Sequence, residues 1–427
     1  MRRTQAAAAV LCLRALASAG VFAQDAKKYE VKAPIKIQWW HALESQYLPL
    51  VDKIVADFEK ANPLIDVEAI YQGAYKDVNE KLIAAQAAGT TLPALTVANT
   101  PLVAEYGASG LCENLEPYAK ATGFDVKDFG DGHIASTSYE GKQVALPFLI
   151  STQIMFYNKD MADAEKIKLP ETWAEMDAFM KKASKKAADG TVQRYATVIP
   201  GWDQWYFEPF YLNAGVALVN KDRQSTDLGG AKALEIAKKM KQWCDEKSAY
   251  WAYGKDASSV MRQNFIDGKT FSVIHTTSLY EMYSQNCKFK VGMQYLPGNA
   301  RRDSEVGGSV LLIPAKNPQD VKNAAWKFLS YLTSNEVNMY TARGTGYIPT
   351  RISVTKSAEG KAFLAEKPAF KAVFDNLGHI YPRIQHPAYT AFAKIWMQEM
   401  AKSIIEGGDM EAAMKKAVPL LDEALAD

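Results

Sequence analysis

The stretch that decides the fold is residues 35–69, IKIQWWHALESQYLPLVDKIVADFEKANPLIDVEA. Apolar and polar residues alternate over 35–39, which is the pattern of a strand with one buried face. Apolar residues then fall on one face of a helix over 46–61, and an Asn-Pro pair ends that helix. Alternation returns at 65–69. The order of strand, helix and strand predicts two parallel strands joined by a crossing helix.

The same alternation continues downstream. A helix at 77–88 leads to a strand at 95–98, after which Thr100-Pro101 has the residue types of a helix N-cap and a first helical position. This β-α-β-α-β-α order predicts a mostly parallel sheet that is covered by helices on both faces. The pattern restarts after residue 139, and the last hundred residues are mainly helical. Further strands and helices are predicted at 144–156, 170–186, 234–244, 271–274, 310–313 and 321–334.

The length of the chain, 427 residues, favours two domains, because single hydrophobic cores stop growing beyond about 250–300 residues. The sequence has no internal repeat and no low-complexity linker. We therefore expect two α/β lobes between which the chain crosses more than once. We assign residues 24–140 and 281–335 to the N-terminal lobe, and residues 141–280 and 336–427 to the C-terminal lobe.

The first 23 residues have the pattern of a secretory signal. Arg2 and Arg3 precede an apolar stretch from Ala6 to Phe22, and signal peptidase cleavage is predicted after Ala23. A membrane anchor would need about 20 uninterrupted apolar residues, and the sequence has no such run. We therefore expect a protein that is free outside the cytoplasm.

Charge and cysteine content narrow the class of protein further. The chain has 50 basic and 48 acidic residues, and the signal holds three of the basic ones, so the mature net charge is about −1. This balance gives no support to a nucleic-acid partner, which favours a basic face. Cys112, Cys244 and Cys287 follow the signal, and we place one disulfide between Cys244 and Cys287, which leaves an odd cysteine.

Enzyme signatures are missing from the sequence. It has neither a Gly-x-Ser-x-Gly elbow nor a His-Glu-x-x-His zinc helix. The run Gly268-Lys269-Thr270 matches the end of a P-loop, but Gln263 stands where the loop needs glycine. The five histidines are not paired at helical spacing, so we assign no metal site, no cofactor and no catalytic residue. A binding protein is favoured, with a hydrolase lacking these motifs and a scaffold without a ligand as the alternatives.

A binding site in an open α/β sheet is expected at the carboxyl ends of the strands, close to helix N-termini. In this sequence the candidate segments are therefore the polar, aromatic and glycine-containing stretches that lie beside predicted strands. They are Trp40-His41, Tyr71 to Tyr75, Asn99-Thr100, Ser151-Thr152, Thr276-Thr277 and Gly307-Gly308.

Several of these segments belong to an ordered series of motifs that spans nearly the whole mature chain. The series is Trp40-His41-Ala42-Leu43-Glu44, Tyr71-Gln72-Gly73-Ala74-Tyr75, Pro147-Phe148 leading to Ser151-Thr152, Phe156-Tyr157-Asn158-Lys159-Asp160, Gly201-Trp202-Asp203-Gln204-Trp205, Gly307-Gly308-Ser309 and Gly344-Thr345-Gly346-Tyr347-Ile348-Pro349. With the export signal, the series resembles the extracellular solute-binding proteins of ABC importers. Within that group it is most similar to the periplasmic glycerol-3-phosphate-binding proteins.

The resemblance implies a periplasmic binding protein fold, in which two α/β lobes close on a ligand by a hinge motion. It implies a substrate-binding component of an ABC importer that works with a membrane permease and an ATPase. The implied ligand is glycerol-3-phosphate or a related glycerophosphodiester, and the alternative is an oligosaccharide or polyol. We expect a monomer without a cofactor.

The resemblance also implies a set of ligand-binding residues. Hydroxyls and a glycine amide would hold the phosphate, since they donate hydrogen bonds to its oxygens without adding charge. These groups fall on Tyr75, Ser151, Thr276, Gly308 and Tyr347. Aromatic faces for the carbons of a polyol or sugar would come from Trp202 and Trp205, and Trp40 and Tyr71 are further candidates.

Two positions depart from the glycerol-3-phosphate pattern. The glutamate that grips the glycerol hydroxyls in the family falls on Thr100. The arginine that pairs with the phosphate falls, by spacing from Glu406-Gly407-Gly408, on Lys394, which offers a point charge without a bidentate fork. Other cations remain alternatives for this role, namely Arg301, Arg343 and Arg383.

Overall fold

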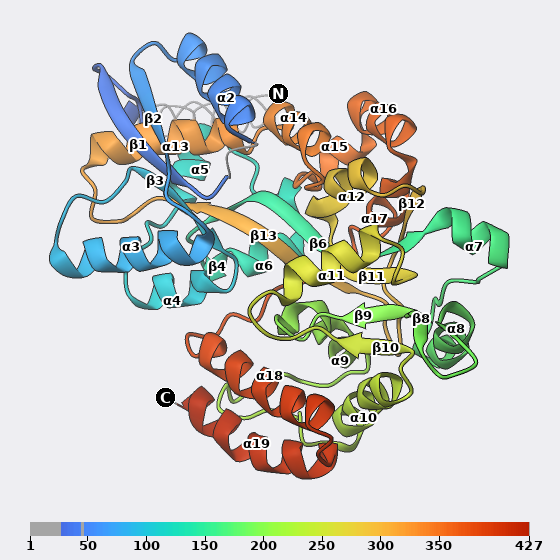
Figure 1. Ribbon diagram of the computed structural model, residues 1–427. Helices are drawn as coiled ribbons and strands as arrows, with labels where there is room; N and C mark the ends of the chain where they lie inside the picture. The colour runs from blue at the N-terminus through green and yellow to red at the C-terminus, as the bar shows by residue number, and fades with distance from the viewer. Residues whose placement is uncertain (1–26, 44–46, 427) are drawn as a thin grey trace, which may run out of the picture.

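The computed structural model describes residues 27–43 and 47–426 (Figure 1). The predicted signal, residues 1–23, lies outside the described residues, and so does Gln46 at the start of the first predicted helix. Within the described part of the chain, no helix combines the length and the apolar character needed to cross a membrane.

The N-terminal lobe is built on three parallel strands, as the sequence predicts. Strand β1 (Ile35–His41) pairs in parallel with β2 (Ile65–Tyr71) on one side and with β3 (Leu95–Asn99) on the other. The connections are α2 (Leu48–Ala61) and α3 (Tyr75–Ala88). This part of the fold follows from the patterning because each strand alternates and each helix carries one apolar face.

Beyond these strands the expectation of a mostly parallel sheet is wrong. Strand β13 (Ser304–Leu312) is antiparallel to β3 and to β6 (Leu146–Asn158). Strands β11 (Ser272–Thr276) and β12 (Val291–Gln294) are antiparallel to β6, and the short β14 (Ile380–Tyr381) is parallel to β13. The direction of these strands is set by contacts between segments that are far apart in the sequence. The local pattern of apolar and polar residues does not predict such contacts.

Strands β6 and β13 connect the two lobes. Residues 146–152 of β6 pair with β13, whereas residues 153–158 pair with β11 and β12. Residues 309–312 of β13 pair with β3 of the N-terminal lobe. Figure 1 shows both strands crossing the middle of the molecule. The predicted crossing between lobes is thus made by continuous strands.

Each lobe has its own core. Trp39, Phe58 and Phe328 pack together between β1, α2 and α13 (Gln319–Leu332), in the upper left of Figure 1. A second core contains Trp243 of α10 and Trp396 of α18 and also involves α19. These three helices lie at the bottom of Figure 1. The bounds of these helices are Ala231–Asp245, Tyr389–Ile405 and Met410–Ala426.

The segment after residue 280 packs into a third hydrophobic cluster. Helix α12 (Tyr280–Asn286) contributes Tyr283, and β12 contributes Met293, to a core that also holds Phe265. The segment thus packs with elements of the C-terminal lobe. The remaining elements are α4 (Leu102–Ala108), α5 (Glu116–Thr122), η2 (Lys127–Phe129), α6 (Asp131–Ser136), β4 (Ser138–Tyr139), β5 (Lys142–Gln143), α7 (Lys159–Glu165), η3 (Trp173–Glu175), α8 (Met176–Ala183), β7 (Lys185–Lys186), β8 (Val192–Arg194), β9 (Thr197–Ile199), η4 (Gln204–Tyr206), α9 (Glu208–Asn213), β10 (Ala249–Trp251), α11 (Ala257–Ile266), η5 (Thr277–Leu279), α14 (Asn335–Gly344), α15 (Ile352–Lys356), α16 (Ala358–Glu366), η6 (Pro368–Phe370) and α17 (Lys371–Phe374).

Two predicted helix boundaries are corrected. Thr100 is not an N-cap, because the N-cap residue of α4 is Pro101 and the Thr100 hydroxyl bonds to no backbone amide. The helix predicted over 170–186 is divided into η3 and α8, and it ends at Ala183, since the next residues enter β7.

The predicted disulfide between Cys244 and Cys287 is wrong. Both residues are free thiols, as is Cys112. Cys244 packs against the core that holds Trp243, whereas Cys287 packs against the separate cluster that holds Tyr283. The prediction rested on the number of cysteines alone, and that number carries no information about which core each one joins.

Reduction is therefore expected to leave the melting temperature unchanged. Burial raises the pKa of the thiols of Cys112 and Cys244 to about 12 and that of Cys287 to about 11, so none forms the thiolate that disulfide exchange requires. Calorimetry with and without a phosphine reductant measures this. Maleimide labelling in denaturant should modify all three thiols without reductant, and labelling that requires reductant would contradict the expectation.

Candidate ligand-binding cleft

A cavity of about 290 Å³ lies where β6 and β13 cross between the lobes. The structure brings eight of the eleven predicted ligand-binding residues to its wall. They are Tyr75, Thr100, Ser151, Trp202, Trp205, Thr276, Gly308 and Tyr347. They come from the start of α3, the residue after β3, both crossing strands, the segment around η4, the end of β11 and the loop after α14.

The backbone at the centre of the cavity depends on Gly308. This residue lies within β13, and not before the strand as the sequence predicts, and its φ is +92°. A Cβ added there would lie 1.9 Å from the carbonyl oxygen of Leu149 on β6. Glycine therefore lets the two crossing strands approach each other, and the pairing shifts register between Gly308 and Val310. Ser151 pairs with Gly307 in the same place.

Two tyrosines face each other across the cavity wall. Tyr75 is the first residue of α3, and Tyr347 follows α14 in the sequence. Burial raises the pKa of both phenols, and their side chains hydrogen-bond to each other. Both hydroxyls therefore stay protonated at neutral pH. One of the two protons is used in the hydrogen bond between them, so the pair has one proton left to donate to a ligand oxygen.

The two tryptophans have different environments. Trp205 is only 7% exposed, and its indole Nε1 donates to the carbonyl oxygen of Val306 at 3.2 Å. Its ring also fills the space beside Gly307, where an added Cβ would lie 2.2 Å away. Trp202 is half-buried, its ring packs 5.0 Å from that of Tyr206, and its Nε1 has no hydrogen-bond partner among the described residues. Trp205 thus has a structural role that sequence reasoning did not assign.

Trp202→Ala is expected to weaken ligand binding with little loss of stability, because a half-buried ring offers its face to the cavity. Trp205→Ala is expected to lower the free energy of unfolding by about 3–5 kcal/mol, the usual cost of removing a buried aromatic ring. Urea denaturation and calorimetric titration on both variants separate the two roles. Equal losses of stability in the two variants would place Trp202 in the core as well.

Two threonines supply further hydroxyls. The hydroxyl of Thr276 lies 3.0 Å from that of Ser278, and both residues line the cavity. Thr100 is only 1% exposed, and its Oγ1 has no hydrogen-bond partner in the described part of the chain. A ligand hydroxyl or phosphate oxygen would satisfy this buried group, which otherwise costs free energy.

Three predicted residues do not line the cavity. Trp40 is half-buried and packs against the cluster that contains Leu82, so its role is in the core. Tyr71 lies at the end of β2 and is 47% exposed. Lys394 lies on an exposed face of α18. The assignment of the phosphate-pairing cation to Lys394 is therefore corrected.

Arg383 is the basic side chain that the structure places in the cavity wall. It lies between β14 and α18 and is 7% exposed. Its Nη1 is 3.4 Å from Glu208 Oε2 and 3.3 Å from Glu305 Oε2. Sequence reasoning held Arg383 only as an alternative, because the spacing from Glu406-Gly407-Gly408 pointed to a helix position and not to the loop before it.

Comparison with known proteins shows the family to which the chain belongs. Residues 53–372 match the family of bacterial extracellular solute-binding proteins. The chain belongs to this family. The glycerol-3-phosphate-binding periplasmic protein UgpB of Yersinia pseudotuberculosis is 22% identical over 360 residues, which are 79% of each chain. The protein of the same name from Escherichia coli O1:K1 is 25% identical over 347 residues, covering 77% of this chain and 76% of the relative.

Solved structures show the same two-lobed architecture. The sugar-binding protein MalE of Xanthomonas citri has a TM-score of 0.80 and 22% identity, covering 92% of this chain and 98% of its own. UgpB of Mycobacterium tuberculosis, solved with glycerophosphocholine, has a TM-score of 0.78 and 22% identity, covering 92% and 99%. This solute-binding protein is thus the substrate-binding component of an ABC importer and not an enzyme, and its family is extracellular.

Carboxylates surround Arg383 beneath the cleft of this solute-binding protein. Glu208 and Glu305 are both fully buried, and Glu208 also accepts a hydrogen bond from the hydroxyl of Tyr389. Burial raises the pKa of Glu305 well above its usual range. Burial likewise raises the pKa of Asp203, whose Oδ1 accepts a 3.0 Å hydrogen bond from the backbone amide of Trp205.

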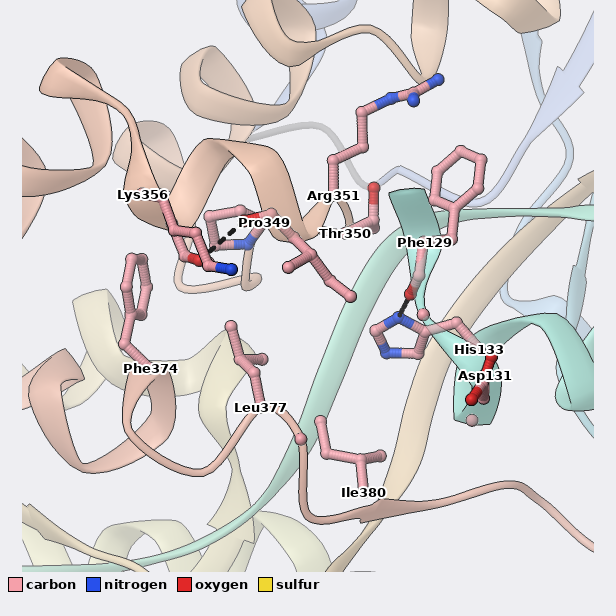
Figure 2. A pocket seen from close by; sticks show the side chains of 15 residues that line it. Phe129, Asp131, His133, Pro349, Thr350, Arg351, Lys356, Phe374, Leu377 and Ile380 are labelled. Atoms are coloured by element: carbon pink, nitrogen blue, oxygen red, sulfur yellow. Dashed lines mark hydrogen bonds between the residues drawn. The ribbon is translucent and has the colours of Figure 1, made fainter. Parts of the chain in front are cut away.

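A second cavity, of about 400 Å³, contains none of the predicted site residues (Figure 2). It lies between residues 129–133 and the segments 349–356 and 374–380. Its wall includes apolar side chains such as Leu377 and Ile380, and His133 Nδ1 hydrogen-bonds to the carbonyl oxygen of Phe129 at 2.8 Å. Its lining lacks the series of hydroxyls that marks the cleft, so we assign no ligand to it.

Proposed function

We propose that this solute-binding protein captures glycerol-3-phosphate or a related glycerophosphodiester by lobe closure and delivers it to the permease of its ABC importer. The observation that carries the proposal is the position of Arg383, a buried guanidinium in the wall of a cavity whose lining includes several hydroxyls, aromatic rings and glycines. A guanidinium offers paired donors that match the geometry of phosphate oxygens.

The hydroxyl groups support the same ligand. Tyr75, Ser151 and Thr276 stand on different elements around one small volume, so a compact anion could receive donors from several sides at once. The unpartnered hydroxyl of Thr100 and the half-buried ring of Trp202 would serve the glycerol end of the ligand. The names of the curated relatives, which are glycerol-3-phosphate-binding proteins, agree with this assignment.

A neutral oligosaccharide or polyol is the second candidate. It is favoured by one specific observation, which is that Arg383 is already paired with two buried glutamates and so brings little free charge to the cleft. The cavity volume of about 290 Å³ would suit a small sugar as well as a phosphate ester. The carboxyl group of Asp203, which lines the cavity, adds acceptor oxygens for sugar hydroxyls.

Location and lobe boundaries complete the proposal. We propose that the protein works in the periplasm after cleavage behind Ala23, and the mass of the protein released by osmotic shock would test this.

We also propose that residues 280–303 move with the C-terminal lobe during closure, because Tyr283 and Met293 pack with Phe265. The remaining assignments stand as proposed from the sequence, with residues 24–140 and 304–335 in the N-terminal lobe and residues 141–279 and 336–427 in the C-terminal lobe.

Isothermal titration with glycerol-3-phosphate, glycerophosphocholine and maltose tests the ligand. We expect saturable heat with at least one phosphate compound and none with maltose. The matched control is Lys394→Ala, which removes the exposed lysine of α18 and should bind as the wild type does. Tight binding of maltose, with no heat from either phosphate compound, would replace this proposal by the sugar receptor.

A further inference from the structure

The cluster around Arg383 joins four separate parts of the chain. Glu208 begins α9, Glu305 lies in β13, Tyr389 begins α18, and Arg383 lies in the loop before α18. Every one of these side chains is at least nine-tenths buried. The same Nη1 atom of Arg383 faces both glutamates, whereas its Nε has no hydrogen-bond partner in the described chain.

The charges of this cluster do not favour an anion with two charges. Arg383 is the one basic side chain among the described residues that line the cavity, and Asp203 also lines it. Glu208 and Glu305 lie directly against the guanidinium, so its positive charge is balanced before any ligand enters. Both carboxyl groups lie within 3.4 Å of one guanidinium nitrogen, so the positive charge of Arg383 is matched inside the protein and little of it is left for a ligand.

We infer that Glu208 and Glu305 are specificity-determining residues, which balance the charge of Arg383 so that the cleft admits ligands with at most one negative charge and rejects phosphomonoester dianions. This inference rests on the proposed function and narrows it. Arg383 acts mainly as a hydrogen-bond donor to the ligand, and the two glutamates act through Arg383 without touching the ligand.

The physical reason is the cost of burying an unbalanced charge. A phosphomonoester carries about 1.5 to 2 negative charges at pH 7, whereas a phosphodiester carries one. A second charge in this enclosed site would find no second cation, and burial of a charge without a partner costs several kcal/mol. The two buried glutamates are not needed for packing alone, since apolar residues of similar size would stabilise such a site as well.

The first experiment uses the wild-type protein and compares two ligands at pH 7.5 and pH 5.5. Glycerol-3-phosphate loses its second charge near pH 6, so its affinity should rise roughly 20-fold at the lower pH, in proportion to its monoanion. Glycerophosphocholine keeps one phosphate charge throughout. Any change in its affinity between the two pH values therefore comes from the protein, that is from Asp203, Glu208, Glu305 and Arg383. The change in affinity for glycerol-3-phosphate is divided by this value to obtain the effect of the ligand's own charge.

The second experiment uses the double variant Glu208→Gln/Glu305→Gln, which keeps the shape of both side chains and removes any carboxylate charge that balances Arg383. Its affinity for glycerol-3-phosphate at pH 7.5 should increase at least about 10-fold, while its affinity for glycerophosphocholine changes less. The matched control is Glu399→Gln, which alters another buried glutamate that pairs with Lys402 on α18, outside the cavity lining. This control should bind both ligands as the wild type does.

The two experiments distinguish failure of the charge limit from failure of the proposed function. Equal corrected affinity for glycerol-3-phosphate at both pH values overturns the charge limit and leaves the proposed function intact. A folded double variant whose affinity for glycerol-3-phosphate does not rise also overturns the charge limit. If the double variant fails to fold, the comparison of the two pH values decides the question alone. Absence of binding by both phosphate compounds at both pH values overturns the proposed function, and the charge limit with it.

Discussion

Replacement of Arg383 by Met is expected to lower the free energy of unfolding by about 3–5 kcal/mol, the usual cost of breaking a buried ion pair from one side. Met fills a similar volume but leaves Glu208 and Glu305 without a cation, and neither glutamate reaches solvent. Ligand binding should be lost as well. Urea denaturation followed by tryptophan fluorescence measures the stability.

The loss in Arg383→Met should be larger at pH 8 than at pH 5. Burial raises the pKa of Glu305, and without the guanidinium the opposing effect of Arg383 is lost, so above the unfolded value of about 4.3 the folded variant binds more protons than the unfolded chain. Its stability therefore falls as pH rises above that value. Lys394→Met, on an exposed face, should stay within about 0.5 kcal/mol of the wild type. The triple variant that adds Glu208→Gln and Glu305→Gln should recover most of the loss, and a loss independent of pH would contradict the account.

Gly308→Ala is expected to have an effect of similar size. A residue with φ of +92° strains any side chain, and the added Cβ would lie 1.9 Å from the Leu149 carbonyl oxygen. Backbone strain and overpacking together give about 2–6 kcal/mol of destabilisation. Because the clash separates the two crossing strands, the variant should also fail to bind ligand even where it remains folded.

Gly110→Ala is the matched control for Gly308→Ala. Gly110 also has a positive φ, +68°, but an added Cβ would meet no atom within 4 Å. Its cost should therefore be limited to backbone strain of about 1–2 kcal/mol, and ligand binding should be unchanged. Thermal unfolding and titration of both variants give the comparison. Equal stability losses would mean that β6 and β13 move apart without cost.

The sequence predicts the N-terminal half of the fold well because its information is local there. The alternation at 35–39 and the apolar face over 46–61 give β1 and α2 directly, and the crossing helix makes the strands parallel. The direction of β6 and β13 could not be predicted in this way. It is set by contacts between residues more than 150 positions apart, such as Ser151 with Gly307.

The candidate site was predicted where it follows strand ends, and missed where it does not. Ser151 and Gly308 were found because a polar or glycine residue beside an apolar strand is a recognisable pattern. Arg383 lies in the loop between β14 and α18, which has no periodic pattern, so spacing from a distant motif misplaced its role onto Lys394. Glu208 and Glu305 carry no spacing signal, because their pairing exists only after the chain has folded.

The crossing strands restrict how this receptor could evolve a new ligand preference. Ser151 and Gly308 belong to the β6 and β13 segments that hold the lobes together, so a substitution there changes the moving joint and the ligand contact simultaneously. Thr100 and Trp202 lie outside those strands, so substitutions there change ligand contacts without altering the pairing of β6 with β13. We therefore expect selection for new cargo, in a directed evolution experiment, to accumulate substitutions at Thr100 and Trp202 before it reaches the strands.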